Sequence, residues 1–172
     1  MTLESPHALV GAAAAEIFLS RPQHCAEAVV LALNRHLTGG LPPAQAAGVA
    51  SGFSLGLGGA GCLCGALSGA TLCLGLFLAP RGDRLERRAA RKAAKALHQS
   101  FLEAHGSACC RELCRAASGD ETEARAKRCA AITGFAAAEA ARLILEIRPE
   151  LAGTGFAPAP GLFSRLRRLL RP

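Results

Sequence analysis

The sequence predicts an all-α fold, and three features of its 172 residues support that prediction. Hydrophobic residues make up 51% of the chain, and many of them are alanine, the residue with the highest helix propensity. Aromatic residues account for only 4%, Trp and Tyr are absent, and β-branched residues are few, so the residue types that favour strands are scarce. Proline, aspartate and glycine divide the chain at intervals suited to helices. We therefore expect a compact bundle of about six or seven helices in residues 1–150, followed by a linker and a short basic tail in 151–172.

Each helix expected in the first part of the chain has its own start or stop signal. Pro6, Pro22 and Pro43 suit the first turn of a helix, because proline lacks the N–H group that would be unpaired there. Asp83 suits the N-cap of a long basic helix, and Gly106 suits its C-terminal end. The helices predicted from these signals cover about 6–19, 22–37, 42–53, 64–79 and 84–105.

The pattern after this long basic helix is less regular. Ser107 is expected to cap a short helix over 108–117. The stretch "ETEARAKRC", residues 121–129, has no clear helical pattern, and helix is expected again over 136–148, ending before Pro149.

Residues 56–78, "GLGGAGCLCGALSGATLCLGLFL", carry no charge and contain seven glycines. Their length alone would suffice for a membrane span, which needs roughly 20 apolar residues. Most of the glycines precede Cys64, however, and they leave a helix of only about 15 residues, a length typical of a buried core helix. We expect a glycine-rich loop followed by a buried helix and no membrane insertion, with a small membrane protein as the alternative.

The net charge of +7 does not indicate nucleic-acid binding, because the basic residues are not accompanied by stacking aromatics or by a recognisable module. The first residues lack the basic segment of an export signal, so a cytoplasmic location is expected. Thiols stay mostly reduced in that compartment, and the eight cysteines are therefore better explained as metal ligands or redox thiols than as structural disulfides.

Three cysteines fall in the first turn of an expected helix: Cys25, Cys64 and Cys110. The unpaired N–H groups and the helix dipole at that position lower the pKa of a thiol and suit a thiolate-ligated cluster. Cys73 follows Cys64 by about 900° of helical rotation, so it points to the opposite face and is expected to be a buried core residue. The chain has no C-x-x-C pair and no C-x-x-C-H motif, which argues against a thioredoxin-type site and against covalently bound haem.

The order of four segments resembles a known bacterial family, C_GCAxxG_C_C, whose members are described as redox-active. These segments are "HCAEAVVLAL" (24–33), "ASGFSLGLGGAGCLCGALSGATLCLGL" (50–76), "CCRELC" (109–114) and "RCAAITGFAAAEAARLILE" (128–146). The resemblance covers about 20–147, and the element "CGALSGA" after the glycine run is its most specific part. Similar domains in split-Soret-type cytochromes are associated with an iron–sulfur centre as well as haem, and only the non-haem part is matched here.

The resemblance implies a site and a function. The family cysteines correspond to Cys25, Cys64, Cys110 and Cys129, and Cys62, Cys109 and Cys114 are additional thiols beside them. The glycines expected beside a bound cofactor are Gly58, Gly59, Gly61 and Gly65. The implied function is an iron–sulfur cluster that serves electron transfer or redox sensing, in an oxidoreductase or electron carrier if the protein is an enzyme.

Several alternatives stay open at this point. The same cysteines suit a dithiol/disulfide pair without metal. The additional thiols also suit a protein that binds Zn or Cu(I). A helical adaptor with incidental cysteines is a further alternative. A redox partner protein and a homodimer are the expected associations.

Overall fold

The computed structural model describes residues 5–20, 24–115 and 121–152, and within these ranges the protein is all-α, as predicted. Its longer helices are α1 (Pro6–Ser20), α2 (Cys25–His36), α3 (Pro43–Ser51), α5 (Gly65–Leu78), α6 (Arg84–His105) and α8 (Glu121–Ile147). Two short helical segments, α4 (Ser54–Leu57) and α7 (Cys110–Leu113), and a final 3₁₀ turn, η1 (Pro149–Leu151), complete the described chain.

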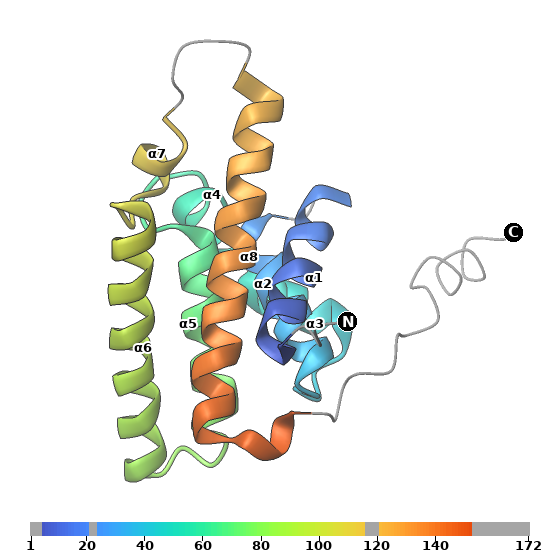
Figure 1. The fold of residues 1–172 in the computed structure, drawn as a ribbon, viewed down its shortest axis with the longest axis vertical. Helices are drawn as coiled ribbons and strands as arrows, with labels where there is room; N and C mark the ends of the chain where they lie inside the picture. Colours follow the sequence, from blue (N-terminus) through green and yellow to red (C-terminus); the bar gives the residue numbers. More distant parts are fainter. Residues whose placement is uncertain (1–4, 21–23, 116–120, 153–172) are drawn as a thin grey trace, which may run out of the picture.

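The helices form a bundle with α5 and α8 at its centre (Figure 1). Helix α6 packs against α5 and α8 on one side, and α1 and α2 cover the other side. The short segments α4 and α7 lie at the end of the bundle where α5 begins. The largest side chains that are fully buried in the core include Leu33, Leu74, Leu97, Phe101 and Ile144.

Helix α6 shows how its sequence sets its limits. The carboxylate of Asp83 accepts a hydrogen bond from the backbone N–H of Glu86 at 2.9 Å, which satisfies one unpaired donor of the first turn. At the other end Gly106 has φ of 74°, the left-handed conformation that glycine adopts without strain. The buried face includes Leu97 and Phe101, so a helix rich in Arg and Lys still contributes to the core.

Two glycines allow helices to approach closely. A Cβ at Gly11 of α1 would lie 2.8 Å from the carbonyl oxygen of Gly134 in α8, and a Cβ at Gly69 of α5 would lie 2.7 Å from the carbonyl oxygen of Ala26 in α2. Real Cβ atoms do not approach that closely, so these crossings depend on glycine.

The uncharged stretch 56–78 is a loop followed by a buried helix, as predicted. Helix α5 has 14 residues, ten of which are buried against the neighbouring helices. Within the described ranges, no helix is both long and apolar enough to cross a membrane.

The structure corrects four details of the predicted helices. Within the described part of the short helix expected over 108–117, residues Cys110–Leu113 are helical, and the N-cap is Cys109 rather than Ser107. Ser107 instead accepts a hydrogen bond from the backbone N–H of Cys109 at 3.0 Å.

The second correction is at the start of the last helix. The stretch 121–129, which showed no clear pattern, belongs to α8, a single helix of 27 residues. The third is that the helix expected over 42–53 ends at Ser51. The helix expected over 22–37 begins at Cys25 with His24 as its N-cap, so Pro22 does not lie in its first turn as expected. The linker and tail from residue 153 onward lie outside the described residues.

Candidate functional site

Five of the eight cysteines meet at one small cavity, which we call the thiol cavity. It has a volume of about 20 Å³, roughly the room of one water molecule. Its lining residues are Cys25, Cys64, Ala66, Cys110, Leu113, Cys114, Cys129, Ile132 and Thr133. The thiol cavity thus brings together all four cysteines that the family resemblance implied, and one of the additional thiols.

Cys114 is the most central of these thiols. Its Sγ lies 3.9 Å from the Sγ of Cys110 and 3.7 Å from the Sγ of Cys129. Cys110 and Cys114 share a face because they are four residues apart in a helical segment. Cys129 comes from the long helix α8, so residues 110–114 contact α8 at this point.

Cys25 and Cys64 enter the cavity from the beginnings of two helices. Cys25 is the first residue of α2, and Cys64 is the N-cap of α5. A Cβ at Gly65 would lie 2.6 Å from the Sγ of Cys25 and 2.9 Å from the carbonyl oxygen of Phe53. Glycine at position 65 therefore leaves the space that the Cys25 thiol occupies.

An antiparallel bridge between two loop segments places Cys110 beside the start of α5. The backbone N–H of Cys64 donates to the carbonyl of Ala108 at 2.8 Å, and the N–H of Cys110 donates to the carbonyl of Cys62 at 2.5 Å. Leu63 and Cys109 form the isolated β-bridge between these hydrogen bonds. The bridge brings residues about 45 positions apart into register.

The other three cysteines do not line the thiol cavity. Cys62 is exposed, and the thiol of Cys109 points elsewhere and donates to the carbonyl oxygen of Gly61 at 3.4 Å. Cys73 is fully buried in the core, where burial strongly raises the pKa of its thiol. Of the three additional thiols beside the family positions, only Cys114 lies at the cavity.

The glycines expected beside a cofactor have different roles in the structure. Gly65 makes room for Cys25, and Gly61 allows the Arg111 side chain to pass close to the loop, since a Cβ there would lie 3.2 Å from its Nε. A Cβ at Gly58 or Gly59 would meet nothing within 4 Å.

Sequence reasoning missed Gly56, which packs against the site. Its φ is 71°, and a Cβ there would lie 2.7 Å from the Cβ of Cys110. The available signal was the run of glycines itself, but spacing alone does not show which member of the run touches a neighbouring segment.

Burial governs the ionisation of the clustered thiols. It raises the pKa of Cys25 to about 11 and, together with the negative charge of neighbouring thiolates, raises the pKa values of Cys110 and Cys129 to about 12. The pKa of Cys64 is also raised by burial. The expectation that a helix N-terminus lowers these pKa values was therefore wrong. Backbone N–H groups act on Cys25 and Cys64 in that direction, but desolvation of the thiolate is the larger effect.

The chemistry of the side chains that line the cavity, though not their present spacing, suits a thiolate-bound metal. All five candidate ligands are sulfur atoms, and neither a carboxylate nor an imidazole lines the cavity. The thiolates raise one another's pKa, and a bound cation would relieve that repulsion and stabilise the deprotonated forms. Among the residues that the structure describes, no group of three or more cysteine, histidine or acidic side chains lies close enough together to hold a metal ion as it stands.

We expect the metal-free protein to lose stability as the pH rises above about 9. The thiol of Cys25 has an ordinary pKa of 9.0 in the unfolded chain and a pKa of about 11 in the folded protein. Between these values the folded protein binds more protons than the unfolded chain, so its free energy of unfolding falls with rising pH, by roughly 1.4 kcal/mol per pH unit for each such thiol. Urea denaturation of the wild type and of Cys25→Ala between about pH 8 and about pH 11 measures this, and the variant should show the shallower fall. Equal slopes for the two proteins would contradict the assignment.

Comparison with known proteins gives a family for the chain. The family model described as "Putative redox-active protein (C_GCAxxG_C_C)" matches residues 23–143, a span that contains all five cavity cysteines. No curated protein and no solved structure matches the chain.

Proposed function

The chain belongs to the C_GCAxxG_C_C family of redox-active proteins, and from this premise we propose that its thiol cavity holds an iron–sulfur centre used for electron transfer. The observation that carries the proposal is the convergence of five thiols from four separate parts of the chain on one partly buried cavity. Electrons would pass to and from a redox partner protein. The cytoplasm, where the thiols stay reduced until the centre is loaded, is the proposed location.

The chemistry of the donor set supports iron. Thiolate ligands favour Zn²⁺, Cu(I) and iron–sulfur clusters among the metals common in proteins. Zn²⁺ has no redox chemistry, so membership of a redox-active family disfavours it. The centre would supply reversible one-electron transfer.

The chain's own residues would hold and shield this centre. Backbone N–H groups near Cys25 and Cys64, that of Ala66 among them, favour the thiolate forms of both cysteines, and such groups tune the potential of thiolate-bound clusters. Leu113 and Ile132 contribute apolar walls that limit the access of water.

The test is the metal content and spectrum of the protein purified without oxygen. We expect iron and acid-labile sulfide in the protein, with visible absorption that is bleached by dithionite and restored by a mild oxidant. Zinc or copper in place of iron, with no sulfide and no visible absorption, would refute the iron–sulfur centre.

The small volume of the cavity favours a second candidate function, in which the thiols act as a metal-free redox pair. Cys114 lies within 3.9 Å of Cys110 and 3.7 Å of Cys129, and a disulfide needs the sulfurs at about 2.05 Å. Oxidation of one such pair would release two protons and pass two electrons to a disulfide of the partner protein. In that case the isolated protein contains no metal, and peptide mapping after mild oxidation finds Cys114 in a disulfide.

A further inference from the structure

A second hollow adjoins the thiol cavity on its outer side, and we call it the arginine groove. It has a volume of about 610 Å³, within the range of small-molecule sites. Its lining residues are Leu55, Gly59, Gly61, Cys110, Arg111, Cys114, Arg115 and Arg125. Cys110 and Cys114 line both hollows, so the groove gives an outside molecule its approach to these two thiols.

Among the described residues that line the arginine groove, every charged side chain is positive. Three guanidinium groups line it, and no carboxylate does. Arg111 donates a hydrogen bond from its guanidinium group to the carbonyl of Ala60 at 2.9 Å. Among the residues that the structure describes, none forms an ion pair with Arg111, Arg115 or Arg125.

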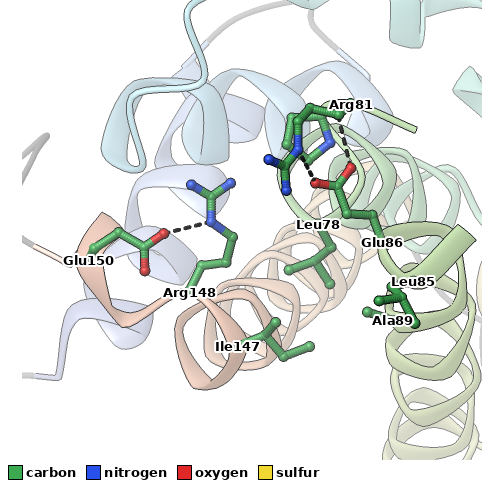
Figure 2. Close-up of a pocket in the computed structure, with 9 residues that line it drawn as sticks. Leu78, Arg81, Leu85, Glu86, Ala89, Ile147, Arg148 and Glu150 are labelled. Atoms are coloured by element: carbon green, nitrogen blue, oxygen red, sulfur yellow. Dashed lines mark hydrogen bonds and ion pairs between the residues drawn. The ribbon is translucent and has the colours of Figure 1, made fainter. Parts of the chain in front are cut away.

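A hollow at the other end of the bundle, between α5, α6 and α8, also contains arginines, but they are paired with carboxylates (Figure 2). Its two arginines are already neutralised, since Arg81 pairs with Glu86 at 2.9 Å and Arg148 pairs with Glu150 at 2.7 Å (Figure 2). An anion entering that hollow would have to compete with these carboxylates. The described residues that line the arginine groove include no such carboxylate.

We propose that the arginine groove binds small anions, of the size of a carboxylate or an oxyanion, and presents them to Cys110 and Cys114. This inference rests on the proposed redox function and assigns the class of small molecule that reaches its thiols. Guanidinium groups suit such ligands because their planar N–H forks bind two oxygen atoms at once. The positive potential of the groove would raise the local concentration of anions over that of neutral molecules.

The test compares two alkylating agents on the reduced, metal-free, full-length protein. Iodoacetate is anionic and iodoacetamide is neutral, and both react by the same step, in which a thiolate sulfur forms a bond to carbon and iodide leaves. Peptide mapping gives the ratio of the two rates at Cys110 and Cys114. We expect the variant Arg115→Gln/Arg125→Gln to lower the iodoacetate-to-iodoacetamide ratio by roughly threefold or more, and high salt to lower the wild-type ratio similarly.

A matched control variant has the same net charge as Arg115→Gln/Arg125→Gln. Arg88 and Arg91 are exposed on α6 and do not line the groove, so Arg88→Gln/Arg91→Gln should leave the ratio unchanged. An equal fall in both variants, or no fall in either, would overturn the proposal. Inorganic phosphate should also slow iodoacetate more in the wild type than in the groove variant. Because the measurement uses metal-free protein, it is independent of the metal assay: a protein without iron can still show the anion preference, and a protein with iron can lack it.

Discussion

Replacing Cys64 with serine should abolish the metal centre while the helical bundle stays folded. Cys64 is the N-cap of α5, and serine is among the best N-cap residues, so the substitution preserves the start of the helix. A hydroxyl group has a much higher pKa than a thiol and cannot supply the anionic ligand. None of the other cavity thiols comes from the start of α5, so none takes the position that Cys64 leaves. Iron and sulfide per chain, with far-ultraviolet circular dichroism for the fold, measure the outcome.

Two other cysteine variants serve as controls for this experiment. Cys109 is next to the cavity residue Cys110, but the thiol of Cys109 points to Gly61. The variant Cys109→Ser should therefore keep the centre. Cys73→Ala removes a fully buried thiol away from the cavity, and it should keep the centre at a cost of about 1 kcal/mol in stability. If the Cys73 variant loses the centre and the Cys64 variant keeps it, the site has been assigned to the wrong thiols.

Replacing Gly69 with alanine should destabilise the protein by about 1–3 kcal/mol, even though alanine has the higher helix propensity. The new Cβ would lie 2.7 Å from the carbonyl oxygen and 3.1 Å from the Cα of Ala26, so the backbones of α2 and α5 would have to separate. That separation also moves Cys25 away from Cys64, because each of these residues stands at the beginning of one of the two helices. Chemical denaturation measures the change in the free energy of unfolding.

Gly75 provides the matched control on the same helix. A Cβ at Gly75 would meet nothing within 4 Å, so Gly75→Ala should raise the free energy of unfolding by about 0.5–1 kcal/mol. A stabilising effect of both substitutions would mean that α2 and α5 do not approach as closely as described.

The parts of the fold that were predictable are those with local signals. Asp83 and Gly106 mark the limits of α6 because an N-cap and a left-handed C-terminal residue are satisfied within a few positions of the chain. The continuity of α8 through 121–129 had no such signal, since its polar residues neither cap nor break a helix and the helix is stabilised by packing against α1 and α5.

The candidate site was predictable only in part, for the same reason. The order of the family cysteines identified four thiols, but the choice among Cys62, Cys109 and Cys114 depends on the bridge between two loops, which no local pattern specifies. The pKa values were wrongly predicted because helix position is readable in a sequence and burial at a contact between several helices is not. Both errors concern interactions between residues far apart in the chain.

The shortness of α7 has a kinetic consequence. Within 108–115 only Leu113 is buried, and a few backbone hydrogen bonds to residues 61–64 hold this segment in place. Detaching it exposes far less surface than separating α5 from α8, so it requires only a small local opening of the structure. For a centre bound among these thiols, the rate of exchange would then follow the rate at which this one segment opens, without unfolding of the bundle.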